Sequence, residues 1–213
     1  MLYQFHELNR SFLTPLTKWA EASSKLFANP LSPLAYTPYS QRMAAAYELV
    51  YRLGKEYEKP QFNIQSTKIA DETIEIIEEI ALAKPFCKLI NFKKNSSDSK
   101  RKANKLQQPK VLIVAPLSGH HATLLRDTVR SLLPTHDVYI TDWIDARMVP
   151  LSAGPFHLHD YIYYVQEFIR HLAPDLHVIS VCQPTVPVLA AISLMASEND
   201  PALPKTMTMM GGP

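Results

Sequence analysis

The sequence has few of the features that mark secreted, metal-binding or membrane-spanning proteins. Its two cysteines, Cys87 and Cys182, lie far apart and predict neither a disulfide framework nor a cysteine-rich metal site. The first ten residues carry His6, Glu7 and Arg10 and hold no apolar core of the kind found in signal peptides. No apolar run approaches the length of a transmembrane helix. These absences favour a reducing, cytoplasmic compartment.

Neither sign of charge is in large excess. The formal net charge of +2 at pH 7 is too small to predict nucleic acid or an anionic membrane as a partner. The basic stretch 93–110 is interpreted as a solvated loop, with polyanion binding as the less favoured alternative. A composition of 46% hydrophobic and 20% charged residues is ordinary for a globular protein, and no metal or other cofactor is expected.

The first part of the chain predicts a helical arm. Residues 2–28 carry apolar side chains at helical spacing, and the proline-rich connector 29–38 is expected to run extended. Ser40 is then expected to cap a second helix that reaches about Glu58. We interpret residues 1–60 as an N-terminal arm that packs on the main domain or on a partner.

Residues 61–213 predict an α/β domain. Over residues 68–92 the β-branched residues are dense and Pro85 interrupts them, which favours two or three short strands. From Lys110 onward the pattern alternates, with strands expected at 111–115, 138–141, 177–181 and 206–210 and helices at 121–133, 156–172 and 184–197. This order predicts a mostly parallel sheet with right-handed crossovers.

Polar residues gather where these predicted strands end. Pro116–His121 follows the first strand of the parallel set, Asp142 and Trp143 follow the second, and Cys182 follows the third. Because active groups in parallel sheets lie at the carboxyl ends of the strands, we expect these three clusters to converge.

The surroundings of Cys182 predict a nucleophile elbow, in which a sharp turn between a strand and a helix lifts the reactive atom above the sheet. A thiol at a helix N-terminus is favoured as the thiolate, and Pro184 suits the first turn of a helix. Ser180 and Pro184 stand where glycines are usual. The competing interpretation is a small buried apolar side chain, the commoner role of a lone cysteine, and the expected convergence favours catalysis.

Several stretches of the sequence resemble one family closely. They are 29–36 (NPLSPLAY), 115–126 (APLSGHHATLLR), 141–154 (beginning TDW and ending AG), 181–184 (VCQP) and 210–213 (MGGP). Across the whole chain they are similar to the intracellular poly(3-hydroxyalkanoate) depolymerases, or polyhydroxybutyrate depolymerases, of the α/β-hydrolase superfamily. That family carries a cysteine in place of serine in its elbow, which accounts for Ser180 and Pro184.

The resemblance implies a site and a reaction. Cys182 would attack the ester carbonyl, and the backbone N–H groups of Gln183 and Leu117 would form the oxyanion hole. The loop residues that could contact substrate are Ser118, Gly119 and His120. A thioester acyl-enzyme would be hydrolysed to 3-hydroxyalkanoate monomers or short oligomers, and the partner would be the polymer or its storage granule in the cytoplasm.

The resemblance also implies that the triad is incomplete in this sequence. The chain order in this superfamily is nucleophile, acid, histidine, and both later residues are expected beyond Pro213. His121 is interpreted as part of the oxyanion loop or a helix start, and Asp142 and Asp145 are not assigned to the triad. The remaining candidates are expected at the surface: His157, His159, His171 and His177. We therefore expect a truncated α/β-hydrolase domain over 61–213 without activity by itself.

Two alternatives remain open. A polyhydroxyalkanoate synthase-like acyltransferase also uses a cysteine on this fold, but glycines are expected around that cysteine. A non-catalytic granule-binding fragment would keep affinity for the polymer surface without chemistry. The oligomeric state and the preferred polymer side chain are not indicated by the sequence.

Overall fold

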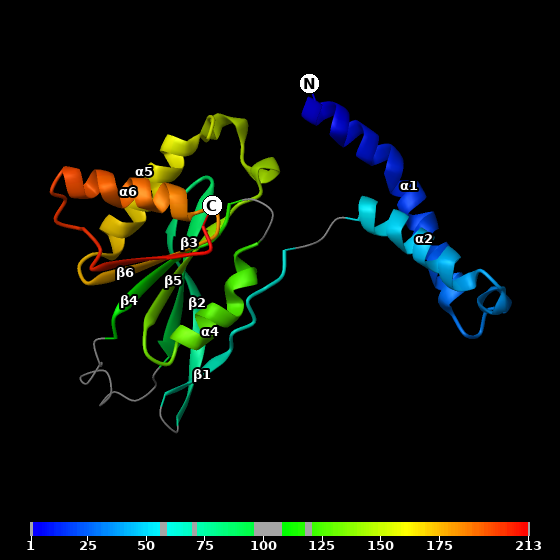
Figure 1. Ribbon diagram of the computed structural model, residues 1–213, viewed down its shortest axis with the longest axis horizontal. Helices are drawn as coiled ribbons and strands as arrows, with labels where there is room; N and C mark the ends of the chain where they lie inside the picture. The colour runs from blue at the N-terminus through cyan, green and yellow to red at the C-terminus, as the bar shows by residue number, and fades with distance from the viewer. Residues whose placement is uncertain (1, 56–58, 70–71, 96–107, 118–120, 213) are drawn as a thin grey trace. The chain divides into compact units, whose positions relative to one another are not determined.

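The computed structural model describes residues 2–55, 59–69, 72–95, 108–117 and 121–212, with the backbone alone for residues 2–14. The chain divides into two units, Met1–Lys59 and Pro60–Pro213 (Figure 1). Within the described residues, no helix is long and apolar enough to cross a membrane.

The first unit is a pair of helices. They are α1 (Leu2–Ala28) and α2 (Ser40–Gly54), and a short 3₁₀ helix, η1 (Pro33–Tyr36), lies between them. The prediction of an extended connector was wrong at η1, because the Ser32 side chain accepts the N–H of Leu34 and a proline opens the turn.

The predicted start and end of α2 also differ from the structure. Tyr39 holds the N-cap position without a side-chain bond, and Ser40 is the first helical residue, so Ser40 does not cap. The helix ends at Gly54 rather than near Glu58. A Cβ atom at Gly54 would lie 2.0 Å from Cγ2 of Thr17 on α1, so the close approach of the two helices requires glycine here.

The second unit is built on a seven-stranded sheet within the described residues. Its strands are β1 (Ser66–Ile69), β2 (Glu72–Ala83), β3 (Cys87–Asn95), β4 (Lys110–Val114), β5 (Asp137–Trp143), β6 (Leu176–Val181) and β7 (Thr206–Met210). Their order in the sheet is β1-β2-β3-β5-β4-β6-β7. The strands β5, β4, β6 and β7 are parallel. β3 pairs antiparallel with β5, and β2 and β1 continue the sheet, with β2 antiparallel to β3 and β1 antiparallel to β2. The predicted α/β fold is confirmed.

Helices cover both faces of the sheet (Figure 1). They are α4 (Arg126–Leu132), which follows the 3₁₀ helix η2 (Ala122–Leu125), then α5 (Leu158–Leu172) and α6 (Thr185–Ser197). Along β4, Val111 and Ile113 belong to the apolar cluster under α4, and Leu112 and Val114 to the cluster under α5 and α6. A strand covered on both faces is apolar at every position, which explains this run.

The region predicted as two or three short strands is dominated by a long hairpin. β2 and β3 have 12 and 9 residues, and Pro85 lies in the tight turn between them, where the Cys87 N–H bonds to the Lys84 carbonyl at 3.3 Å. Periodicity alone underestimated these strands because the hairpin is half exposed and its pattern is irregular.

The basic stretch 93–110 is not a loop over its whole length. Lys93 and Lys94 lie within β3, Lys110 begins β4, and residues 96–107 lie outside the described residues. Lys94 donates to the side-chain oxygen of Gln108 at 2.6 Å, and burial lowers its pKa. At its ends the stretch is therefore part of the sheet.

Candidate active site

Cys182 stands at the turn between β6 and α6 with φ of +66°, in the left-handed region that residues other than glycine rarely adopt. Its side chain is exposed to solvent. A conformation of this kind costs about 1–3 kcal/mol and persists only where its surroundings hold it. An exposed side chain on a strained turn between a strand and a helix is the geometry of a nucleophile elbow.

Hydrogen bonds on both sides hold this turn. The N–H of Cys182 donates to the carbonyl of Met210 at the end of β7, at 2.8 Å. The carbonyl of Cys182 accepts both the N–H and the hydroxyl of Thr185, at 3.1 and 2.9 Å. Gly212 lies against Thr185, since a Cβ there would be 2.3 Å from the threonine hydroxyl oxygen. The elbow is therefore fixed by α6 and by the chain that leaves β7.

The segment after β4 lies between the elbow and the end of β5. Val114 pairs with Ser180, so the residues after the two strands run side by side. The indole N–H of Trp143 donates to the Ala115 carbonyl at 2.9 Å. The Leu117 N–H donates to the side-chain oxygen of Gln183 at 3.3 Å. The structure thus brings together the ends of the strands that hold Trp143, Leu117 and Cys182.

These contacts bear on Gln183 and Leu117, the two residues predicted to form the oxyanion hole. Gln183 follows Cys182 at the start of the turn into α6, and Leu117 faces its side chain. In this structure the Leu117 N–H is bonded to the Gln183 carboxamide. Ser118, Gly119 and His120 lie outside the described residues.

Cys87 has the buried, apolar environment that was the competing interpretation of Cys182. It is fully buried in the cluster under α5, beside Leu89 and Tyr161, and its thiol makes a long contact of 3.5 Å with the Lys88 carbonyl. A fully buried thiol among apolar side chains is a packing residue. Of the two cysteines, only Cys182 is presented to solvent.

The described histidines have roles elsewhere. The backbone N–H of His157 donates to Asp160 at the start of α5, at 2.7 Å. His177 lies near the amino end of β6, whereas Cys182 follows the carboxyl end of that strand. The ring nitrogen Nδ1 of the half-buried His177 lies 2.8 Å from the Thr206 hydroxyl oxygen. His136 is half-buried, and its ring nitrogen lies 2.8 Å from the Thr135 hydroxyl. The remaining three with described side chains are exposed: His121, His159 and His171. Within the described part of the chain, no histidine bonds to Cys182.

The two aspartates that follow Thr141 differ in environment. Asp142 is buried within β5 opposite Lys88, at 5% exposure. Asp145 accepts hydrogen bonds from the guanidinium of Arg147, which hold the pKa of its carboxyl below the ordinary value. Neither is in contact with the elbow through a hydrogen bond that the structure gives.

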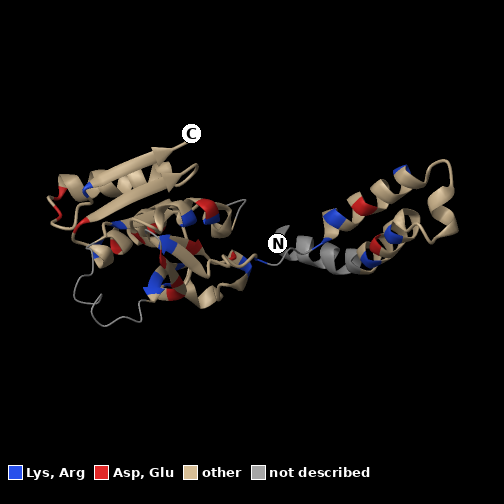
Figure 2. Ribbon diagram, turned by 90° about the horizontal axis from the view of Figure 1, so that it is seen from below, with Lys and Arg blue, Asp and Glu red and all other residues tan. Residues whose placement is uncertain are grey.

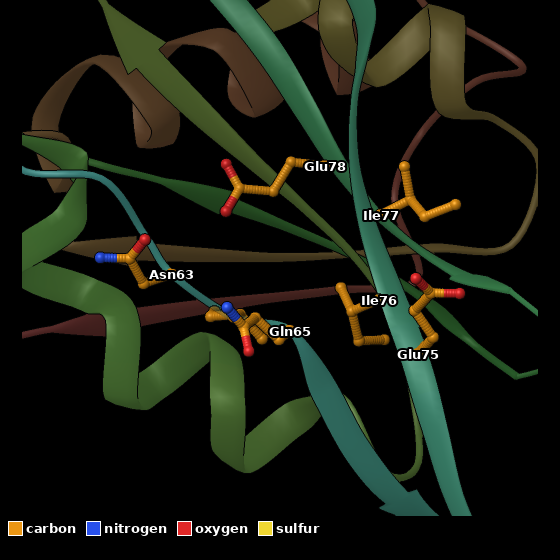
Figure 3. A pocket seen from close by; sticks show the side chains of 7 residues that line it. Asn63, Gln65, Glu75, Ile76, Ile77 and Glu78 are labelled. Carbon is orange, nitrogen blue, oxygen red and sulfur yellow. The ribbon is translucent and has the colours of Figure 1, made fainter.

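A surface pocket lies away from the elbow. It is lined by residues of β2 and of the segment before β1, and Figure 3 shows Glu78 on the same side of β2 as Asn63. Three strands, β3, β5 and β4, separate β2 from β6. No group of three or more histidine, cysteine or acidic side chains in the described residues is arranged to hold a metal ion.

Sequence reasoning missed three parts of the elbow: Thr185, Gly212 and the carbonyl of Met210. The one local signal was a threonine in the first turn of a helix, three residues after the cysteine. The contacts of Met210 and Gly212 depend on β7 lying next to β6, which no local pattern encodes.

The comparisons with known proteins concern the fold. No protein-family model matches the chain, and no curated protein matches it. One solved structure similar to it is a serine-to-alanine mutant of LAE6, an alpha/beta hydrolase enzyme from the metagenome of Lake Arreo, Spain, at 12% identity and a TM-score of 0.43. Another is MGS-M1, an alpha/beta hydrolase enzyme from a Medee basin deep-sea metagenome library, at 13% identity and a TM-score of 0.27.

Both matches are partial. The first covers 93% of this chain and 58% of the LAE6 chain, and the second covers 52% of this chain and 47% of the MGS-M1 chain. The chain thus spans less than two thirds of either. At these identities the likeness describes the fold alone, and the interpretation of the site depends on the elbow geometry.

Proposed function

We propose that this chain carries the nucleophile of a cysteine-dependent carboxylic ester hydrolase that acts on poly(3-hydroxyalkanoate). The observation that carries the proposal is the exposed Cys182 at φ of +66° between β6 and α6. The choice of polymer rests on the sequence resemblance around 115–126 and 181–184, and it includes the storage granule as the place of action. Both solved structures above are described as alpha/beta hydrolase enzymes, which is consistent with hydrolysis in general.

The proposed reaction has two steps. In the first, the Cys182 thiolate attacks the ester carbonyl, a carbon–sulfur bond forms, and the carbonyl electron pair becomes an oxyanion facing backbone N–H groups. Collapse of that intermediate breaks the ester carbon–oxygen bond, and the leaving alkoxide takes a proton from a general acid. In the second, water loses a proton and attacks the thioester, which releases the hydroxy acid and the thiolate.

The general acid and base of this scheme must be supplied from outside the described site. No histidine follows Cys182 in the given sequence, and the described histidines do not bond to it. We propose that the imidazole and its carboxylate partner belong to a further segment, because hydrolases of this kind follow the order nucleophile, acid, histidine. In this proposal the elbow provides the thiol, the helix N-terminus and the Gln183 N–H, and the segment after β4 provides the second oxyanion donor, the Leu117 N–H.

The decisive experiment uses the full-length protein with amorphous polyhydroxybutyrate granules. Cys182→Ala should abolish release of 3-hydroxybutyrate, because it removes the thiol that would form the acyl-enzyme, and Cys87, the other cysteine of residues 1–213, is buried. Cys87→Ala is the matched control, since it removes the buried thiol and should retain release. Activity that survives Cys182→Ala would disprove the assignment.

The same protein distinguishes the two alternatives. Polymer formed from 3-hydroxybutyryl-CoA, with no release from granules, would identify an acyltransferase. Binding to granules with neither reaction, and unchanged by Cys182→Ala, would identify a granule-binding protein. Either result would replace the proposed hydrolysis.

A further inference from the structure

The contact between Gln183 and Leu117 joins two parts of the proposed oxyanion hole. The Gln183 side-chain oxygen accepts the Leu117 N–H at 3.3 Å, across 66 positions of sequence. Within the described residues, this is the only hydrogen bond that links 116–117 to the turn at 182–184. The carboxamide oxygen is a carbonyl oxygen, so it occupies the donor in the manner of the acyl oxygen of an ester.

The strength of this bond decides which substrate oxygen can displace the carboxamide from the Leu117 N–H. Its donor–acceptor distance of 3.3 Å lies just beyond the usual range of about 2.7–3.2 Å for an N–H···O bond, and both partners are neutral. A hydrogen bond to an ionised acceptor is roughly twice as strong as one between neutral groups. The carboxamide can therefore hold the Leu117 N–H against a neutral ester carbonyl and lose it to an oxyanion.

We propose that the Gln183 side chain is a positioning residue that keeps the Leu117 N–H aligned and occupied until negative charge develops on the acyl oxygen. This proposal rests on the proposed function. The Gln183 side chain would withhold the Leu117 N–H from the ester carbonyl of the bound substrate and release it to the oxyanion of the transition state. An interaction made in the transition state and not in the ground state accelerates the chemical step.

The neighbouring contacts favour this role over simple support of the segment. Ala115 is already held by a bond from its N–H to the Thr141 hydroxyl at 2.9 Å and by the indole of Trp143 at the same distance. The backbone before Leu117 is therefore anchored to β5 without Gln183. What the carboxamide adds is an acceptor at the N–H that would face the substrate.

Three substitutions in the full-length protein test the proposal. Gln183→Met keeps the length of the side chain without a strong acceptor, Gln183→Glu supplies a charged acceptor that an oxyanion cannot displace easily, and Gln183→Asn is too short to reach Leu117. The substrate is a short-chain ester, and the probe of the tetrahedral state is a trifluoromethyl ketone, which forms a hemithioketal oxyanion with a reactive thiol.

The expected order separates positioning from structural support. Gln183→Met and Gln183→Asn should lower KM about 2- to 10-fold, the worth of one neutral hydrogen bond, because the donor becomes open to the ester. Gln183→Glu should be the worst variant in kcat and in affinity for the ketone. The pH profile of iodoacetamide alkylation corrects each rate for any change in the thiolate fraction of Cys182. A structural role predicts the opposite order, with Gln183→Glu nearest to wild type.

Hydrogen exchange at the Leu117 amide, followed by nuclear magnetic resonance of leucine-labelled protein, supplies a readout besides activity. Exchange should be faster in Gln183→Met and slower in Gln183→Glu than in wild type. Equal exchange in all variants would overturn the proposal even if Cys182 is the nucleophile. If exchange changes as expected but the ketone binds no variant at Cys182, the proposed function itself fails, and with it the catalytic role of Gln183.

Discussion

Thr185 donates two hydrogen bonds to the carbonyl oxygen of Cys182, one from its backbone N–H at 3.1 Å and one from its hydroxyl at 2.9 Å. Together with the bond from the Cys182 N–H to Met210, they surround a residue whose backbone angle costs about 1–3 kcal/mol. Each such bond contributes about 0.5–1.5 kcal/mol, so three of them offset a cost of this size. The strained turn is stable because α6 and β7 hold it.

The first prediction concerns the hydroxyl of Thr185. Thr185→Val keeps the shape of the side chain and the backbone bond but removes the hydroxyl, and it should lower the free energy of unfolding by about 0.5–1.5 kcal/mol. The time course of Cys182 alkylation by iodoacetamide should also depart from a single exponential, because a loosened turn holds the thiol in more than one position. Thr135→Val is the control, because the Thr135 hydroxyl also bonds a carbonyl three residues back but is exposed and lies after α4. Equal effects of the two changes on Cys182 would contradict the role of Thr185.

The second prediction concerns the contact of Gly212 with Thr185. Gly212→Ala places a carbon 2.3 Å from the Thr185 hydroxyl oxygen and 2.9 Å from its Cβ, so the chain after β7 must shift. Overpacking of this kind costs about 1–3 kcal/mol, measurable by urea unfolding, and should change the alkylation rate of Cys182. Gly154→Ala is the control, since nothing lies within 4 Å of its Cβ and only its φ of +80° is strained. It should lower stability and leave Cys182 unaffected.

The third prediction separates the two thiols by exposure. In the native protein, iodoacetamide should modify Cys182 and leave Cys87 intact, because Cys87 is fully buried under α5. In urea, both should react. Mass spectrometry of peptides that contain each cysteine measures this directly. Native modification of Cys87 ahead of Cys182 would mean that the core around β3 opens more readily than the structure indicates.

The fourth prediction follows from Tyr139. Burial, followed by the nearby Asp137 carboxylate, raises the pKa of this phenol above its ordinary value of 10.0. A raised pKa contributes stability that is present below the unfolded pKa and is lost as pH rises through the folded one. Stability should therefore fall as pH increases above 10, and Tyr139→Phe should make that fall less steep. Asp137→Asn, which leaves the burial in place, should reduce the slope only in part. Urea unfolding at pH 9–11 measures all three proteins.

The fifth prediction concerns the outer surface of α6 and β7. Neither element contains a charged residue (Figure 2), and Leu189, Met209 and Met210 are between 44% and 48% exposed. Within the described residues β7 pairs with β6 alone, and an uncharged edge strand promotes association. The given chain should therefore self-associate, and Met210→Lys with Leu189→Glu should reduce this in light scattering. Leu124→Glu, at another exposed apolar position, should not.

Much of the parallel half of the sheet was determined by local sequence. The strands ending at Val114, Trp143 and Val181 and the helices α5 and α6 lie within a few residues of their predicted bounds, because burial on both faces imposes apolar runs and helical periods that can be read along the chain. The position of Cys182 between a strand and a helix was local in the same sense.

The long-range contacts were decided only by the tertiary structure. The length of the β2–β3 hairpin depends on how the two strands pair. The need for glycine at position 54 depends on how closely α1 approaches α2. At the site, the elbow was predictable, but its supports were not. Met210 and Gly212 reach Cys182 and Thr185 through the pairing of β7 with β6, and Gln183 reaches Leu117 because β4 pairs with β6. Such contacts join residues far apart in the chain, and local patterns carry no information about them until the sheet order is known.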